Sequence, residues 1–267
     1  MKKKYKAVFS DIDGTLLNSS HKIPEKTKEK IYKLQEEGIP FVLVSARFPK
    51  AMMAIWNELG AKCPMITYSG AAIIDQNGNM IYSEELDSQI AKNIYAYIRS
   101  NSGPEIAVNV FFSGHWMVED KTHPWVQYET KVTGIIPEEV SFFDEKVFDH
   151  VHKILCMGDA CLIAELEEKL IAEFHGVEIS KSKDTYLEIL SLNATKSNAI
   201  KKFGELFHIA REEIIAFGDS QNDMNMLEYA GLGVAMKNAA QEVKAAADYV
   251  TDTNDNEGLK LVLDQVF

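Results

Sequence analysis

Two carboxylates stand directly after the first apolar run of the chain, in the segment DIDGTLL at residues 11–17. Residues 7–9 precede it and are predicted to form a short buried strand. Along an extended backbone, residues i and i+2 point to the same side, so Asp11 and Asp13 are expected to face one point. Such a pair repels unless a cation or a reaction separates the charges. Because Asp and Gly are also common in turns, the segment alone is equally compatible with a plain turn.

A strand–helix pattern follows this segment. A helix is predicted between Pro24 and Gly38, because Pro is favoured at the start of a helix and Gly just past its end. The apolar residues 41–44 predict a second strand, which ends at Ser45 and Arg47. Another helix and a third apolar run, at residues 64–75, come next. This alternation predicts an α/β fold in which helices cover a parallel sheet.

The sequence changes in character from about Ser83 to about Leu190, where amphipathic helical stretches alternate with β-rich pieces. This stretch is long enough to form a domain of its own. We therefore expect a core domain at residues 1–83 and 190–267, with an inserted α+β domain at residues 84–189. The inserted stretch is rich in aromatic residues, which either contact a ligand or, as the preferred interpretation, pack the domain's own core: Phe111, Phe112, Trp116 and Trp125.

The strand–helix pattern resumes after the inserted stretch. A helix opened by Lys196 leads to an apolar strand at residues 214–217, which again ends in acids. These are Asp219 and Asp223, with Asn222 between them. Ligands of open α/β sheets bind at the carboxyl ends of the strands. The polar residues that end the three strands are therefore expected to meet in one crevice.

Each of these side chains also has a plain structural explanation. Ser45 could begin a turn, and a lysine at a helix start, such as Lys196, is usually solvated. Ser220 and Asp223 fit a capping box, in which the carboxylate satisfies backbone amides at a helix start. Capping and a role near a metal are compatible. Any one of these clusters could arise by coincidence. Coincidence is a poorer explanation for the presence of all of them in this order.

Composition restricts the partners and the setting. The chain has 28 Lys and Arg against 40 Asp and Glu, a formal charge of -12, so nucleic acid and acidic membranes are not expected as partners. Cys63, Cys156 and Cys161 form no CxxC pair, which favours core packing in a reduced, cytoplasmic setting. No apolar run reaches transmembrane length, and Asp11 interrupts the basic N-terminus too early for a signal peptide.

The histidines give little indication of a metal site. His150 and His152 are the one close pair among the seven histidines of the chain. A surface helix explains this pair better than metal ligation does.

Four segments together resemble the motifs of the haloacid dehalogenase superfamily of phosphatases. They are DIDGTLL, Ser45 at the end of the second strand, Lys196 at a helix start, and GDSQND at residues 218–223. GVAMKNA and AADYVTDTNDNEG near the C-terminus are similar to the Cof-type branch, whose members carry a large mobile cap. The resemblance implies a Rossmann-like parallel-sheet core with helices on both faces and an inserted α+β cap. Over the cap, the resemblance is one of length and position only.

The resemblance also implies an activity, the Mg²⁺-dependent hydrolysis of small phosphomonoesters such as sugar phosphates or phosphorylated cofactors. Asp11 would be the nucleophile that forms an aspartyl-phosphate. Asp13 would protonate the leaving oxygen and then activate water. A small phosphorylated metabolite would be the partner.

The remaining roles concern metal and phosphate. The resemblance implies that Mg²⁺ is held by Asp11, by the backbone carbonyl of Asp13 and by Asp219, with Asp223 in an outer position. Hard oxygen ligands of this kind suit Mg²⁺. The phosphoryl oxygens would be bound by Ser45, Lys196 and Asn222.

Three positions depart from the family pattern, and two other functions use similar residues. Ala46, Ser197 and Lys237 stand where glycine is common, and Lys237 could reach the site or only the solvent. A phosphosugar mutase would use the same Asp pair while excluding water. A signalling receiver also places a lysine near a phosphorylated Asp, but it needs a much shorter chain and no inserted domain.

Overall fold

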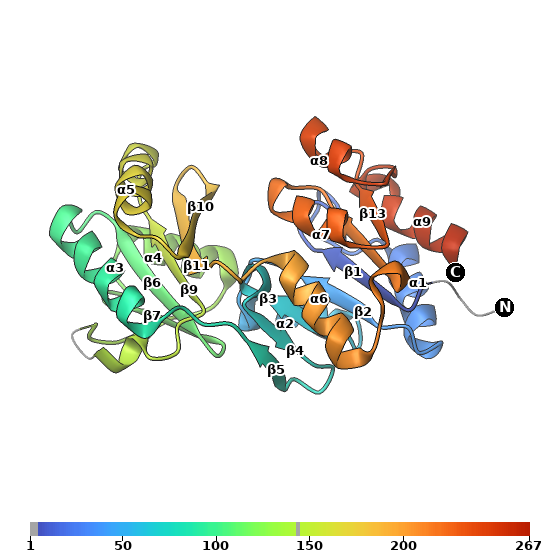
Figure 1. Ribbon diagram of the computed structural model, residues 1–267, viewed down its shortest axis with the longest axis horizontal. Coiled ribbons are helices and arrows are strands. Elements are labelled where there is room, and N and C mark those ends of the chain that lie inside the picture. Colours follow the sequence, from blue (N-terminus) through green and yellow to red (C-terminus); the bar gives the residue numbers. More distant parts are fainter. Residues whose placement is uncertain (1–4, 143–144) are drawn as a thin grey trace. The chain divides into compact units, whose positions relative to one another are not determined.

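The computed structural model describes residues 5–142 and 145–267, so Lys2, Lys3 and Lys4 of the basic N-terminus lie outside the described residues. The chain divides into two compact units (Figure 1). Unit 1 comprises residues 1–47, 52–82 and 195–267, and unit 2 comprises residues 48–51 and 83–194. From the sequence, we expected the inserted domain at residues 84–189.

Unit 1 is built on a sheet of eight strands in the order β14-β13-β12-β1-β2-β3-β4-β5. Its strands and longer helices are β1 Ala7–Asp11, α1 Glu25–Glu36, β2 Phe41–Val44, α2 Pro49–Glu58, β3 Met65–Thr67, β4 Ala72–Ile74, β5 Met80–Ser83, α6 Lys196–Phe207, β12 Ile214–Gly218, α7 Met224–Tyr229, β13 Leu232–Ala235, α8 Gln241–Ala246, β14 Tyr249–Val250 and α9 Gly258–Val266. Short 3₁₀ turns lie at η1 Tyr68–Gly70, η3 Arg211–Glu213, η4 Gln221–Asp223 and η5 Asn254–Asn256.

Helices cover both faces of this sheet because its central strands are apolar on both sides. Val8 of β1 belongs to one buried cluster with residues of α1, α2 and α9. Its neighbours Ala7 and Phe9 belong to another, with residues of α6, α7 and α8. Figure 1 shows α6, in orange, lying across the strands of unit 1. Strands buried on both faces are typical of α/β proteins, and the predicted fold class is confirmed.

The third apolar run of the sequence folds differently from the single strand that we expected. It forms β3 and β4, which pair antiparallel, whereas β14, β13, β12, β1, β2 and β3 are parallel neighbours. The chain reverses at Tyr68, Ser69 and Gly70, which have positive φ angles of 52°, 57° and 115°. A Cβ atom at Gly70 would lie 2.2 Å from the carbonyl oxygen of Thr195, so only glycine fits there.

Unit 2 has a second sheet, in the order β10-β11-β9-β6-β7-β8, in which only the β7–β8 pair is parallel among the described pairs. Alternate residues of its central strands pack against α3 and α5 in one buried cluster, among them Val108, Ile154 and Leu187. The elements are α3 Ser88–Asn101, β6 Ala107–Phe112, β7 His115–Val118, α4 Pro124–Thr133, β8 Glu138–Glu139, η2 Glu145–Phe148, β9 Lys153–Met157, α5 Ala160–Glu173, β10 Val177–Lys183 and β11 Tyr186–Ser191.

Two smaller expectations were wrong. His150 and His152 do not lie on a surface helix: they precede β9, and the His152 side chain is fully buried. Burial of His152 is possible because Ser83 and the backbone amide of Ser113 bind its ring nitrogens. Cys161 is exposed at the start of α5, whereas Cys63 and Cys156 are buried as expected.

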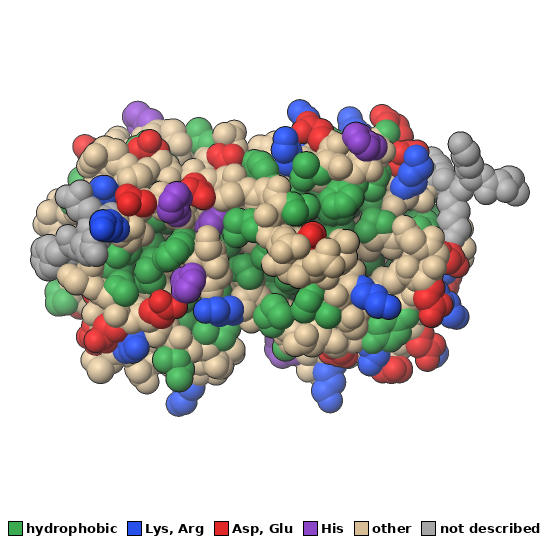
Figure 2. Space-filling model, turned by 90° about the horizontal axis from the view of Figure 1, so that it is seen from below, with side chains coloured by type: hydrophobic (Ala, Val, Ile, Leu, Met, Phe, Trp, Pro, Cys, Tyr) green, Lys and Arg blue, Asp and Glu red, His purple; other side chains and the backbone are tan. Residues whose placement is uncertain are grey.

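In the part of the chain that the structure describes, no helix has the length and apolar character needed to cross a membrane. Among the described side chains on the face in Figure 2, acidic and basic groups are interspersed with apolar ones.

Candidate active site

Three neighbouring strands bring the predicted site residues to one edge of the unit 1 sheet. Asp11 is the last residue of β1 and lies opposite Val44 of β2, so Ser45 follows directly beside it. On the other side, Ser10 of β1 pairs with Phe217 of β12, whose end leads to Asp219. Parallel strands that end at the same level place these residues together, as the sequence analysis predicted.

Lys196 lies at the centre of the cluster. It is the first residue of α6, where Thr195 caps the helix by accepting a hydrogen bond from the amide of Asn198 at 3.2 Å. The Lys196 side chain is 1% exposed. Its Nζ donates to Asp11 Oδ1 at 2.7 Å, to Asp223 Oδ1 at 2.5 Å and to Asn222 Oδ1 at 3.1 Å. The alternative of a solvated surface lysine does not hold, because this lysine neutralises buried carboxylates.

Asp223 serves two partners through its two oxygens. Oδ2 accepts from the backbone amides of Asp219 and Ser220 at 3.0 and 2.9 Å, and from Ser220 Oγ at 2.8 Å. Oδ1 binds Lys196. The predicted capping box is present at η4, and it holds the same carboxylate that faces the lysine.

Asp219 is fixed from the turn that follows β1. Thr15 Oγ1 donates to Asp219 Oδ1 at 2.6 Å. Gly14 has a φ of 85°, and a Cβ atom there would lie 2.3 Å from Asp219 Oδ2. Glycine is required at this position both by the backbone angle and by the close approach of the carboxylate.

The electrostatics of the cluster follow from burial and crowding. Burial raises the pKa of Asp11 well above its usual value, although Lys196 opposes this shift. Burial also raises the pKa of Asp219 to about 6, and the hydrogen bond from Thr15 opposes it. Burial lowers the pKa of Lys196, but the neighbouring Asp11 and Asp223 carboxylates outweigh it, so the net pKa is raised. The cluster therefore has an excess of negative charge that a further cation would relieve.

Three carboxylates are arranged so that they could supply that cation's ligands. Asp11, Asp219 and Asp223 each offer an oxygen, and these atoms lie within 4.8 Å of one another. A group of carboxylate oxygens with an excess of negative charge suits a hard divalent cation such as Mg²⁺. The residues present therefore suit the ion that the resemblance implies.

The Asp13 carboxylate pairs with a different cation from that of Asp11. The Asp13 carboxylate is half exposed and is held by Arg47, with Nη2 to Oδ1 at 2.6 Å and Nε to Oδ2 at 2.9 Å. The reason is that β1 ends at Asp11, so the two-residue alternation of a strand no longer applies at Asp13. The two carboxylates avoid repulsion by binding different cations.

Ser45 and Lys237 have simpler surroundings. The Ser45 side chain is buried, and its Oγ accepts from the backbone amide of Arg47 at 3.2 Å, which is the geometry of a turn. Lys237 is 64% exposed and lies 3.7 Å from Asp252 Oδ1. The sequence left open whether Lys237 reaches the site or only the solvent, and its side chain is largely exposed to solvent.

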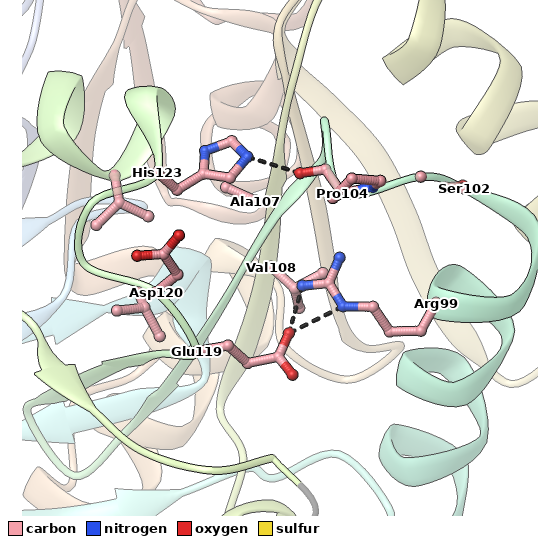
Figure 3. Close-up of a pocket in the computed structure, with 11 residues that line it drawn as sticks. Arg99, Ser102, Pro104, Ala107, Val108, Glu119, Asp120 and His123 are labelled. Carbon is pink, nitrogen blue, oxygen red and sulfur yellow. Dashed lines mark hydrogen bonds and ion pairs between the residues drawn. The ribbon is translucent and has the colours of Figure 1, made fainter.

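A separate cavity lies in unit 2. It has a volume of about 440 Å³, and its polar groups are largely paired. Figure 3 shows Glu119 directed at the guanidinium of Arg99 and His123 directed at the carbonyl of Pro104. Nδ1 of the His123 ring accepts a hydrogen bond from the backbone amide of Trp125. Nε2 therefore carries the hydrogen and donates a hydrogen bond to the carbonyl oxygen of Pro104. All of its lining residues belong to unit 2, so it is distinct from the Asp11 cluster of unit 1.

The fold and the cluster define an α/β enzyme whose site lies at the carboxyl ends of parallel strands. Comparison with known proteins makes this more specific, because a profile of haloacid dehalogenase-like hydrolases matches residues 8–263. The chain belongs to the haloacid dehalogenase-like hydrolase family. The predicted family and the prediction of a hydrolase are confirmed.

Individual relatives agree with this assignment. A Haemophilus influenzae protein named "Putative phosphatase" is 40% identical, and the match covers 98% of each chain. The Bacillus subtilis protein YwtE, named 5-amino-6-(5-phospho-D-ribitylamino)uracil phosphatase, is 28% identical over 98% of each chain. Among solved structures, a haloacid dehalogenase-like hydrolase from Bacteroides thetaiotaomicron has a TM-score of 0.89 at 31% identity, covering 99% of this chain and 100% of that one. A subclass IIB sugar phosphatase, BT4131, has a TM-score of 0.81 at 27% identity, covering 97% and 98%.

Some residues of the site were not identified from the sequence. Arg47, which was expected among the polar residues at the strand ends, holds Asp13, but Thr15 and Gly14, which fix Asp219, were given no chemical role. Two asparagines, Asn238 and Asn254, bind the turn that carries these residues. The only signal for them was the C-terminal pair of segments GVAMKNA and AADYVTDTNDNEG, to which no role was assigned.

Proposed function

We propose that this protein is an Mg²⁺-dependent phosphatase that hydrolyses small phosphomonoesters through an aspartyl-phosphate on Asp11. The observation that carries the proposal is the buried cluster in which Lys196 joins Asp11 to Asp223 at the carboxyl edge of the sheet. A carboxylate at a strand end, beside a fixed lysine, can approach a phosphate if positive charge offsets the repulsion. The names of the relatives, which are phosphatases, agree with this reaction class.

In the first half-reaction, an oxygen of Asp11 forms a bond to phosphorus as the bond from phosphorus to the ester oxygen breaks. Asp13 gives its proton to the departing oxygen, so that an alcohol leaves. In the second half-reaction, Asp13 takes a proton from a water molecule that attacks phosphorus. The bond between Asp11 and phosphorus breaks, and inorganic phosphate and the free carboxylate result.

The other residues of the cluster bind and hold charge. Lys196 supplies a positive charge for the phosphoryl oxygens, and Ser45 and Asn222 supply hydrogen bonds. Asp11 and Asp219 would hold Mg²⁺ together with the carbonyl of Asp13, and Asp223 would support it. When bound, the ion neutralises charge on the phosphoryl group.

The substrate class and the role of unit 2 extend the proposal. The relatives include a sugar phosphatase and a phosphatase of a phosphorylated ribityl compound, which supports sugar phosphates or phosphorylated cofactors as substrates here. Residues 84–189 would act as the cap that selects among them. Their aromatic residues include Phe111 and Trp116, which are buried and stack with ring centroids 6.0 Å apart.

The nucleophile is tested by the substitution Asp11→Asn. An amide oxygen is a poor nucleophile, so hydrolysis of p-nitrophenyl phosphate with Mg²⁺ should fall by at least about 10³-fold. Asp184→Asn, a change of the same kind at an exposed position of unit 2, serves as the control and should keep full activity. Parental activity in a folded Asp11→Asn protein would refute the proposal.

The acid role is tested by the substitution Asp13→Asn. Hydrolysis of an alkyl phosphate should slow by about 10²–10⁴-fold, the usual contribution of general acid–base catalysis. Hydrolysis of p-nitrophenyl phosphate should slow less, because its leaving group depends less on protonation. Equal slowing of both substrates would contradict the role of Asp13.

The mutase alternative predicts that turnover requires a bisphosphate activator, and the receiver alternative is disfavoured by the hydrolase family match across residues 8–263.

A further inference from the structure

The turn at residues 14–17 joins the two halves of the candidate site. Asp13 stands at its start, Thr15 binds Asp219, and an isolated backbone bridge links Asp13 to Leu17. The backbone amide of Leu17 also donates to the carbonyl of Ile12 at 2.9 Å. This turn lies outside the sheet, so the position of Asp13 depends on what holds the turn.

Two asparagines from the C-terminal part of unit 1 bind this turn. Asn238 Nδ2 donates to the carbonyl oxygen of Gly14 at 2.9 Å. Asn254 Nδ2 donates to the carbonyl oxygen of Leu17 at 2.8 Å, and the Asn254 side chain is buried. The two are joined because the Asn254 amide donates to Asn238 Oδ1 at 3.2 Å. Together they fix both ends of the turn.

The strands explain why these asparagines reach the turn. Asn238 follows β13, and Asn254 begins η5 just after β14. Both strands run parallel to β12 and β1, so their carboxyl ends lie at the same edge of the sheet. Asp255 adds a third contact, since its carboxylate accepts from the amide and the hydroxyl of Ser19 at 2.8 and 2.6 Å.

We infer that Asn238 and Asn254 are positioning residues, which act on the reaction by holding the turn at residues 14–17 and, through it, Asp13. This inference deepens the proposed function and rests on it. Neither asparagine is required to touch the substrate. A displacement of about 1 Å in a group that transfers a proton can cost about 10²-fold in rate. A loosened turn would displace Asp13 in this way.

The sharpest test is Asn238→Asp, which keeps the shape of the side chain. One carboxylate oxygen can still accept from the Asn254 amide, but the other would face the Gly14 carbonyl without a proton to donate. We expect kcat for an alkyl phosphate such as glycerol phosphate to fall by about 10²-fold. The fall for p-nitrophenyl phosphate should be less than about 10-fold, since its leaving group needs little protonation. KM should change little for either substrate, and equal slowing of both substrates, or none, would overturn the inference.

A second readout does not depend on activity. Amide hydrogen exchange over residues 14–17 should be faster in Asn238→Asp and in Asn254→Ala than in the parent protein. The matched control is Asn256→Ala, an exposed asparagine of the same segment that binds Asp252 rather than the turn, and it should leave exchange and both rates unchanged.

The two readouts separate the inference from the proposed function. If the parent protein hydrolysed neither substrate, the proposed function would fail, while faster exchange in the two variants would still support the holding of the turn. Unchanged exchange in both folded variants would overturn the inference whatever the rates.

Discussion

Asp11 and Asp13 are two residues apart, yet their surroundings are opposite. Asp11 is buried against Lys196, and Asp13 is half exposed against Arg47. The sequence pattern placed both at the end of an apolar strand, and the family resemblance implied a different chemical role for each. What the pattern missed was the end of the strand at Asp11, because side-chain alternation holds only along extended backbone.

Lys196 permits a prediction about stability. Lys196→Met leaves the buried carboxylates of Asp11 and Asp223 without their cation, so the free energy of unfolding at pH 7 without metal should fall by about 3–5 kcal/mol. Urea unfolding measures this. Adding Asp223→Asn to the variant should recover part of the loss, because one uncompensated charge is removed.

The control for this prediction lies on the same helix. The side chain of Lys202 on α6 is 41% exposed and pairs with Glu205 at 3.2 Å. Lys202→Met should change the free energy of unfolding by less than about 0.5 kcal/mol. A similar loss in both variants would show that Lys196 contributes only as a surface lysine does.

At the scale of elements, the strands with unbroken apolar runs were predicted, whereas β10 was not. Residues 41–44 and 214–217 could be recognised because parallel strands buried on both faces are apolar throughout. β10 escaped recognition because it is an edge strand with most of its side chains exposed. The reversal between β3 and β4 depends on the close approach of Gly70 to Thr195, which are far apart in the sequence.

The segment before β9 gives a prediction of pH dependence. Burial lowers the pKa of His152 below its usual value, whereas the hydrogen bond that the exposed His150 donates to the Glu85 carboxylate raises the pKa of His150. The unfolded chain therefore takes up a proton at position 152 below about pH 6.5 while the folded protein resists it. Stability should fall as the pH drops from 7 to 5, and His152→Gln should flatten this fall.

For His150, we expect the opposite pH dependence of its contribution to stability. The raised pKa of His150 means that its contribution is present at low pH and is lost as the pH rises through the folded value. His150→Gln should therefore steepen the loss of stability on acidification. Urea unfolding at a series of pH values measures both variants. If both substitutions changed the slope of stability against pH in the same direction relative to the parent protein, the assignment would be contradicted.

At the scale of the whole molecule, the two units have separate cores and separate tasks in the proposal. Trp56 packs against the core of unit 1, and Trp116 belongs to unit 2. Because the carboxylate cluster lies in unit 1, a bound cation should stabilise that unit.

This gives a prediction on metal binding. In a variant that keeps only Trp56, free Mg²⁺ at about 100 times its dissociation constant should raise the free energy of unfolding by about 2.7 kcal/mol relative to EDTA. Asp219→Asn should abolish the rise, because it removes a ligand. Tryptophan fluorescence during urea unfolding follows the change, and an equal rise in both proteins would place the ion elsewhere.

The contacts of Glu84 bear on how this chain could have gained its inserted stretch and how that stretch could be engineered. Its Oε1 accepts from Ser191 Oγ at 2.7 Å and from Asn193 Nδ2 at 3.3 Å, so the stretch at residues 83–194 begins and ends at nearly the same point. A segment with adjoining ends is a module: it can be gained, lost or exchanged by recombination without breaking the host sheet. The same adjacency makes it a natural place to graft a different module onto an unchanged catalytic core.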